Sequence, residues 1–170
     1  MKAVLALKDG TVFEGEGFGA ASETGGEVVF NTSLVGYEES LTDPSYKGQI
    51  LTLTYPLVGN YGVRKDKFES DKVQVEGFVV REFQDHYSHR GSVKSVSEFL
   101  KEHGIPGISG IDTRMLTKKI REHGVINGYL VTSDGEIDIN DVVAKAKASA
   151  EYGSVDYLPK VSVAEPEYID

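Results

Sequence analysis

The sequence predicts a domain of mixed α and β class, with either one mixed sheet or two stacked sheets. The first half of the chain contains short runs rich in β-branched and aromatic residues, separated by turns that carry Gly and Asp. The second half contains three segments whose apolar residues recur at helical spacing. Further strand-like runs lie between these segments, so helices and strands alternate in the second half.

Five strands are expected in the first half, at residues 2–7, 11–18, 27–31, 49–54 and 73–80. Lys8-Asp9-Gly10 separates the first two, and Asp-Gly between apolar runs is a strong signal for a β-hairpin. Pro56 ends the fourth strand because proline lacks the amide hydrogen that a sheet needs. Residues 59–62, Gly-Asn-Tyr-Gly, then predict a turn.

Three helices are expected in the second half, at residues 92–103, 112–123 and 138–150. Their predicted N-caps are Ser92, Asp112 and Asp138, because short polar side chains satisfy the free amides of a first helical turn. Gly104 and Gly124 follow the first two helices, as expected for residues that end a helix in a left-handed conformation. A short strand or turn at 107–111 and a strand at 125–132 complete the pattern.

The chain divides into a domain at residues 1–156 and a terminal segment at residues 157–170. The terminal segment alternates polar and apolar residues around Pro159 and Pro166, which is typical of a linker or an edge strand. The 170 residues, of which 39% are hydrophobic, are enough for one domain with its own core.

The composition excludes several classes of function. Eighteen Lys and Arg against 27 Asp and Glu give a net charge of −9, which repels nucleic-acid phosphates and anionic membranes. The chain has no Cys, so it cannot supply a disulfide, a thiolate zinc ligand or a cysteine nucleophile. The apolar run at residues 3–7 is too short for a signal peptide, and no run approaches the ~18 residues that span a bilayer. We therefore expect a soluble cytoplasmic protein.

Two motifs have competing interpretations. Gly15-Glu-Gly-Phe-Gly19 resembles a phosphate-binding glycine motif, but no helical pattern follows it, which favours a flexible loop. Asp85, His86 and His89 could together ligate a metal and form a metal hydrolase, yet no helical stripe surrounds them. The other histidines, His103 and His123, lie at predicted helix ends, where a cation is favourable. A solvated loop is therefore the favoured reading of residues 85–90.

Polar residues gather at predicted strand ends between residues 26 and 62. The turn "LTDPSYKGQ" at residues 41–49 contains Thr42, Asp43, Ser45, Tyr46 and Gln49. Loops at one edge of a sheet often bind ligands or partner domains. A purely structural type I turn is equally compatible with Pro44 at its second position and Asp43 accepting backbone hydrogen bonds. From these residues alone both interpretations stay open.

Longer blocks of the sequence match a known family. "GEVVFNTSLVGYEESLTDPSYKGQILTLTYPLVGNYG", "GISGIDTRMLTKKIREHG" and "NG" at 127–128 resemble the N-terminal domain of the small, glutaminase subunit of carbamoyl phosphate synthetase. The resemblance extends over essentially the whole chain. It implies a swivelling β/β/α fold, with mixed sheets and about three helices packed on one side.

The resemblance also implies a function. In this family a C-terminal class I glutamine amidotransferase domain hydrolyses glutamine, and the ammonia travels to a large subunit that binds ATP and Mg. There bicarbonate, ammonia and ATP yield carbamoyl phosphate, for pyrimidine or arginine synthesis. We therefore expect this chain to dock on the large subunit through an apolar surface of its strand-rich half, and to hold no cofactor or metal itself.

One ligand contact carries over to this sequence. Ser45, within "TDPSY", corresponds to the family serine that reaches the glutamine bound in the neighbouring domain. The chain ends at Asp170, about where the amidotransferase domain would begin, so the chain alone is expected to be inactive. The resemblance assigns no individual role to five other residues, Asn31, Tyr37, Tyr55, Asn60 and Arg114. The alternatives are a free-standing binding or assembly module, or the metal hydrolase built on Asp85, His86 and His89.

Overall fold

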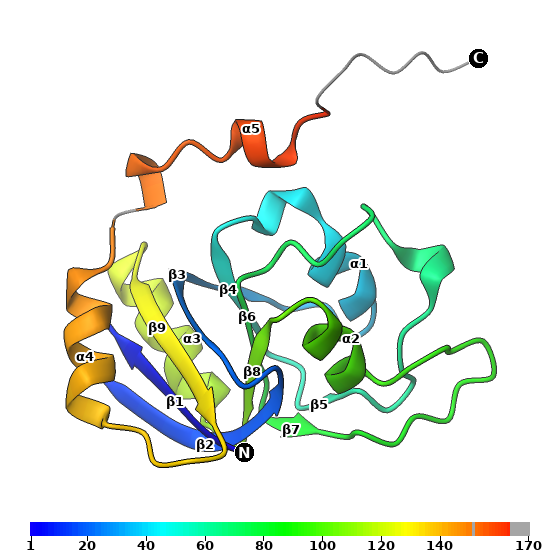
Figure 1. Cartoon of the computed structure of the whole chain (residues 1–170), viewed down its shortest axis with the longest axis horizontal. Coiled ribbons are helices and arrows are strands. Elements are labelled where there is room, and N and C mark those ends of the chain that lie inside the picture. The colour runs from blue at the N-terminus through cyan, green and yellow to red at the C-terminus, as the bar shows by residue number, and fades with distance from the viewer. Residues whose placement is uncertain (151, 164–170) are drawn as a thin grey trace.

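The computed structural model describes residues 1–150 and 152–163, and its centre is a seven-stranded sheet that closes into a barrel (Figure 1). The order of strands around the barrel is β1 (Lys2–Leu7), β2 (Val12–Gly19), β8 (Pro106–Ser109), β6 (Gly77–Val79), β4 (Gln49–Leu53), β3 (Glu23–Asn31) and β9 (Asn127–Ser133). A separate two-stranded sheet pairs β5 (Leu57–Val58) with β7 (Glu82–Phe83). The mixed α and β class is confirmed, and the main sheet is mixed because it contains parallel and antiparallel pairs. It closes into a barrel rather than forming two stacked sheets.

The predicted hairpin forms between β1 and β2. The amide of Leu7 donates to the carbonyl of Thr11 at 2.8 Å, and Gly10 adopts a φ of 90°. The predicted strand at 73–80 shortens to β6, because the backbone before it bonds elsewhere: the amide of Gln74 donates to Leu41 O and that of Glu76 to Gln49 O. The turn at 59–62 is confirmed by a hydrogen bond from the Gly62 amide to Gly59 O at 3.0 Å.

The barrel interior is a single apolar cluster to which every barrel strand contributes. Its strand residues are Ala3, Leu5, Leu7, Phe13, Val28, Ile50, Val79, Ile108 and Leu130. Helix α3 (Thr113–His123) packs Leu116 and Ile120 into the same cluster. Burial of such side chains stabilises each by about 1.5–3 kcal/mol relative to exposure, so this cluster is a main source of stability.

The glycine motif at 15–19 belongs to β2, so its interpretation as a flexible loop is wrong. A Cβ on Gly15 would lie 2.2 Å from the Ser109 carbonyl oxygen of β8. Glycine therefore lets β2 approach β8 closely enough to pair. The next element is β3 rather than a helix, so a dinucleotide-binding turn does not form here.

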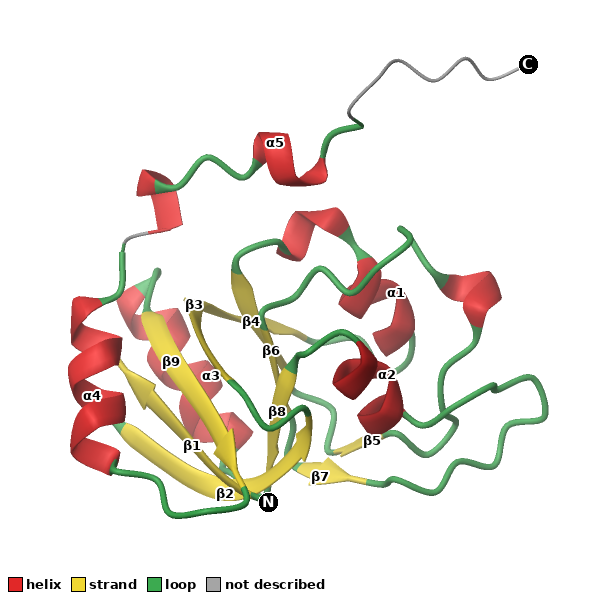
Figure 2. Cartoon of the chain, viewed as in Figure 1, coloured by secondary structure: helices red, strands yellow, loops and turns green. Residues whose placement is uncertain are grey.

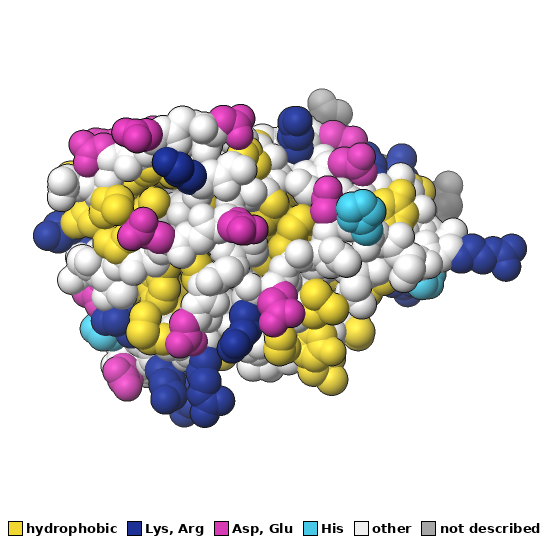
Figure 3. All heavy atoms as spheres, turned by 90° about the horizontal axis from the view of Figure 1, so that it is seen from below, with side chains coloured by type: hydrophobic (Ala, Val, Ile, Leu, Met, Phe, Trp, Pro, Cys, Tyr) yellow, Lys and Arg dark blue, Asp and Glu magenta, His cyan; other side chains and the backbone are white. Residues whose placement is uncertain are grey.

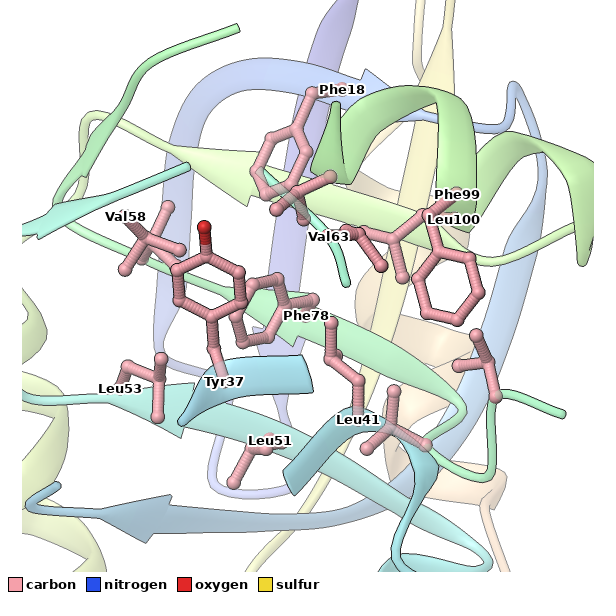
Figure 4. Packing of buried hydrophobic residues seen from close by; sticks show 14 residues of the cluster. Phe18, Tyr37, Leu41, Leu51, Leu53, Val58, Val63, Phe78, Phe99 and Leu100 are labelled. Atoms are coloured by element: carbon pink, nitrogen blue, oxygen red, sulfur yellow. The ribbon is translucent and has the colours of Figure 1, made fainter. Parts of the chain in front are cut away.

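The helices cover different faces of the barrel, which corrects the expectation that they pack on one side (Figure 2). Helix α4 (Ile139–Ala148) lies on β1 and β9 and buries Val142 and Ala146. Helices α1 (Tyr37–Thr42) and α2 (Val96–Glu102) contribute to another cluster, in which Tyr37 and Leu41 of α1 lie beside Phe78 (Figure 4). Strand alternation explains this arrangement, since one face of each strand fills the barrel and the other must be covered.

Two of the three predicted N-caps are confirmed. Asp112 accepts a hydrogen bond from the Met115 amide, and Asp138 accepts one from the Asn140 amide. The predicted N-cap of the remaining helix, Ser92, is wrong. Helix α2 begins instead at a capping box formed by Ser95 and Glu98. Residues 92–94 are held extended, since the Val63 and Lys94 backbones form an isolated bridge. Gly104 and Gly124 follow their helices with φ of 72° and 79°, as predicted.

After α4 the chain runs across one end of the barrel through the short helices η3 (Tyr152–Ser154) and α5 (Leu158–Val161) (Figure 1). The turn of α5 replaces an edge strand at the start of the predicted 157–170 segment, while residues 164–170 lie outside the described residues. The linker role of this segment stays a prediction. No helix within the described ranges is both long and apolar enough to cross a membrane.

Candidate functional site

The turn before β4 has the geometry that its sequence predicts. Helix α1 ends at Thr42 with Asp43 as its C-cap, and the one-turn helix η1 (Pro44–Tyr46) leads into β4. Asp43 Oδ1 accepts the Ser45 amide at 2.8 Å, and the Tyr46 amide donates to Asp43 O at 3.0 Å. Pro44 presets the backbone for this turn, so residues 43–46 form a rigid corner.

Most polar side chains of this turn are used to hold it in place. Thr42 Oγ1 donates to the Glu38 carbonyl at 2.8 Å and accepts the Glu69 amide at 2.9 Å. Tyr46 Oη accepts a hydrogen bond of 2.9 Å from Asn31 Nδ2, at the end of β3. The other pairs are Gln49 with Glu27 at 2.8 Å and Lys47 with Glu76 at 2.6 Å. These residues therefore have structural roles.

Ser45 differs from its neighbours. It is exposed, and its Oγ makes no hydrogen bond to any other part of the chain that the structure describes. Its backbone amide is nevertheless fixed by Asp43, so the hydroxyl is presented on a rigid support. A hydroxyl of this kind can both donate and accept a hydrogen bond to a ligand or a neighbouring domain.

A second exposed feature lies at the other end of β4. Strands β3 and β4 are parallel and pair Asn31 with Leu53, so the loops that follow them emerge side by side. These loops and β5 expose four large apolar side chains: Leu34 (69%), Val35 (71%), Tyr55 (41%) and Leu57 (38%). We call these four residues the apolar patch. They line a common hollow with Tyr61, and Figure 3 shows exposed hydrophobic side chains on the face of the molecule that carries β5 and β7.

Tyr61 supports the loop that carries the apolar patch. Its Oη accepts the Gly36 amide at 2.9 Å and the Tyr37 amide at 3.4 Å, and so satisfies the start of α1. The Tyr37 and Tyr61 rings stack with their centroids 4.2 Å apart. Burial, together with the nearby Glu38 carboxylate, raises the pKa of Tyr61 to about 12. Both phenols therefore remain neutral at physiological pH, because burial also raises the pKa of Tyr37 above its ordinary value.

An ion pair between Glu38 and Arg64 holds helix α1 in place. The Glu38 side chain is fully buried, and its Oε1 lies 3.1 Å from Nε of Arg64, a residue that is partly exposed. A carboxylate is rarely buried without a cationic partner, because removing its charge from water is costly. The Arg64 guanidinium therefore allows Glu38 to occupy the first turn of α1.

The described residues of the loop at 85–90, which contains His86 and His89, do not form the metal site considered in the sequence analysis. Asp85, His86 and His89 are exposed, and His89 Nδ1 accepts the Gly91 amide at 3.1 Å. His103 and His123 lie at the ends of α2 and α3, as expected, with Nδ1 2.9 Å from the carbonyl oxygen four residues earlier in each case. Over residues 1–150 and 152–163 no group of three potential ligands is placed to hold a metal ion. No observation therefore favours the metal hydrolase.

Sequence reasoning predicted an apolar surface in the strand-rich half of the chain, but it did not identify the residues of the apolar patch or its supports. The adjacent Leu34 and Val35 interrupt an otherwise polar loop, and this was the available signal. The five residues without a predicted role are now placed: Asn31 anchors the turn, Tyr37 is buried, Tyr55 belongs to the apolar patch, and Asn60 and Arg114 are exposed.

A rigid polar corner and an apolar patch are typical of a domain that contacts neighbouring domains or subunits. Residues 5–130 match the family described as "Carbamoyl-phosphate synthase small chain, CPSase domain". The chain belongs to this family.

The chain is similar to carbamoyl phosphate synthase small chains of several archaea. The chain is 49% identical to that of Methanopyrus kandleri, over 97% of this chain and 46% of the relative. It is 52% identical to that of Archaeoglobus fulgidus, over 97% of this chain and 46% of the relative. The chain thus spans less than half the length of these relatives. Among solved structures, an aminopeptidase from Aneurinibacillus sp. strain AM-1 superposes with a TM-score of 0.43 at 14% identity over 80% of this chain and 31% of that one, too weak a likeness to carry an argument.

Proposed function

We propose that this chain is the N-terminal domain of the glutamine-hydrolysing small subunit of a carbamoyl phosphate synthase. In the complete protein it borders the glutamine site of a C-terminal amidotransferase domain and docks on the large subunit. It thereby supports the ammonia supply for the synthesis of carbamoyl phosphate from glutamine, bicarbonate and ATP. ATP and Mg bind in the large subunit, and this chain contributes no cofactor.

The observation that carries this proposal is the Ser45 hydroxyl, which has no hydrogen-bond partner among the described residues, on a turn whose other polar side chains are paired. The chain has no Cys and so cannot form the glutamyl thioester, which leaves positioning as its contribution to the chemistry. In the proposed role, the Ser45 hydroxyl hydrogen-bonds the substrate from across the domain interface. A rigid support favours this role because little freedom is lost when the substrate binds.

The apolar patch supports the docking part of the proposal. It lies at the carboxyl end of β4, whereas the Ser45 turn lies at the amino end of the same strand. Five residues of strand separate the two features by about 13–16 Å. One domain can therefore face the amidotransferase domain with one end and the large subunit with the other, without competition for a surface.

The test is Ser45→Phe in the complete small subunit assembled with the large subunit. The ring occupies substrate space, so glutamine-dependent synthesis should fall through a higher KM for glutamine, while synthesis from added ammonium stays near wild type. A fall in kcat would mean that the Ser45 wall also orients the amide for attack. Ser45→Ala should be mild, costing about 0.5–1.5 kcal/mol for one neutral hydrogen bond.

Ser88→Phe is the matched control, since Ser88 is also an exposed serine but lies in the loop at residues 84–91. It should leave synthesis from both nitrogen donors unchanged. Equal losses with glutamine and ammonium for Ser45→Phe would contradict the proposal and leave the turn with a structural role only.

A further inference from the structure

The segment that follows α4 is seated on the Ser45 turn by one aromatic ring. Gly48, three residues after Ser45, has a φ of 83°, and a Cβ built there would lie 2.3 Å from Cζ, 2.5 Å from Oη and 2.7 Å from Cε1 of Tyr157. The phenol ring of Tyr157 therefore lies directly against the Gly48 α-carbon. Only glycine accommodates both this backbone conformation and this contact.

Tyr157 is itself held by local structure. The Lys160 amide donates to the Tyr157 carbonyl at 2.9 Å, which closes the turn of α5, and the Asp156 carboxylate accepts the Leu158 amide at 3.0 Å. Seven residues earlier, the buried Asn127 side chain donates to the Ala150 carbonyl. The segment is thus tied to the barrel at Ala150 and to the Ser45 turn at Tyr157.

Between these two ties the segment is not packed continuously on the barrel. A cavity of about 360 Å³ lies beneath it, lined by Gly25, Gly26, Tyr129, Val155 and Tyr157 among other residues. This space separates part of the segment from β3 and α4, and the contact between Tyr157 and Gly48 attaches the segment to the Ser45 turn.

We infer that Tyr157 is a positioning residue that fixes the segment leading to the amidotransferase domain relative to the Ser45 turn. This inference rests on the proposed function, in which the segment continues into that domain. The ring sits on the backbone of the same corner that presents Ser45. A displacement of the segment therefore changes the distance between the Ser45 hydroxyl and a glutamine held by the next domain.

The first measurement is glutamine kinetics of the complete small subunit assembled with the large subunit. Tyr157→Ala removes the ring, and the KM for glutamine should rise about three- to tenfold, while ammonium-dependent synthesis stays at the wild-type rate. Tyr157→Phe keeps the ring against Gly48, so its KM should stay closer to wild type than that of Tyr157→Ala. Lys160→Ala removes the Nζ that lies 5.1 Å from the ring centroid but leaves the ring against Gly48, so it should raise the KM less than Tyr157→Ala does.

The second measurement is hydrogen exchange of the amides at residues 152–163 in the complete small subunit. Exchange should be faster in Tyr157→Ala than in wild type, and it should change less in Tyr157→Phe and Lys160→Ala, which keep the ring. Gly48→Ala forces a Cβ into the ring, so it should also accelerate exchange, and it should do so less when introduced into Tyr157→Ala.

Unchanged exchange in Tyr157→Ala, or faster exchange with an unchanged KM for glutamine, would overturn the inference. The Ser45→Phe experiment separates this failure from that of the proposed function. If Ser45→Phe impairs glutamine use and Tyr157→Ala does not, the inference alone fails. If neither variant affects glutamine use, the proposed function fails as well.

Discussion

The two ends of β4 present opposite chemistry. At its amino end, the turn at 42–49 is polar, and all of its polar side chains are paired within the described chain except the Ser45 hydroxyl. At its carboxyl end, the apolar patch exposes four large side chains. A single hydroxyl on a rigid corner suits one hydrogen bond to a small ligand, whereas contiguous apolar side chains suit a protein partner that excludes water. One small domain thus offers two kinds of contact.

The two ends are not independent. Helix α1 starts at Tyr37 beside the patch loop and ends at Thr42 beside the turn, and Asn31, at the end of β3, donates a hydrogen bond to Tyr46 of the turn. The contrast between the ends therefore depends on the rigidity of α1 and its supports.

The largest expected effect comes from Arg64→Ala, which should loosen the turn and the apolar patch together, because both depend on α1. This substitution leaves the fully buried Glu38 side chain without the guanidinium nitrogen that lies 3.1 Å from its Oε1, so the free energy of unfolding should fall by more than in an exposed control variant. Urea unfolding of the chain measures this effect. Arg114→Ala, at an exposed arginine on α3, is the control and should change stability by less than about 0.5 kcal/mol. Equal stability of the two variants would refute the structural role of the ion pair.

The next largest expected effect is on the affinity for the large subunit, and it should appear for changes in the apolar patch but not for changes at Ser45. Val35→Asp combined with Leu57→Asp places two charges in the apolar patch, and the affinity for the large subunit should fall about a hundredfold or more. Ser45→Phe, at the other end, should leave that affinity unchanged. Binding is measured with purified large subunit and complete small subunit. Val125→Asp is the control, because Val125 is 67% exposed but lies outside the patch. If the double variant binds like wild type, the patch is not the docking surface.

The smallest expected effect comes from a change at Tyr61, which supports the loop of the apolar patch but not the Ser45 turn. Tyr61→Phe removes the acceptor of the Gly36 and Tyr37 amides, so it should cost about 1–3 kcal/mol of unfolding free energy. The Ser45 turn should keep its geometry, because none of its hydrogen bonds involves Tyr61.

The same residue predicts a dependence on alkaline pH. The pKa of Tyr61 is raised from 10.0 to about 12 in the folded protein, so the unfolded chain loses this proton first. The stability due to the neutral phenol is full below pH 10 and declines as the pH rises through the folded pKa. Unfolding measured at about pH 9 and about pH 11 should therefore show a smaller loss in Tyr61→Phe than in wild type. If the free energy of unfolding falls equally in wild type and Tyr61→Phe, the decline at alkaline pH is due to other tyrosines.

Local features of this protein were predictable because their causes are local. The hairpin at Lys8-Asp9-Gly10, the caps Asp112 and Asp138 and the turn at Asp43 each depend on residues within a few positions of one another. Ser92 failed as a cap because a distant strand bridge, between Val63 and Lys94, holds its neighbours extended.

The sequence by itself determined the mixed α and β class, most strand positions, two helix starts and the family. The tertiary structure decided the closure of the barrel, since β2 pairs with β8 and β3 with β9 across long stretches of chain. It also decided which polar side chains of the turn are paired within the described chain. The partners of Thr42, Tyr46 and Gln49 lie 15 to 27 positions away in the sequence. The apolar patch arises in the same way, since the parallel pairing of β3 and β4 brings two separate loops together. Such pairings depend on packing between distant segments, which local residue patterns do not encode.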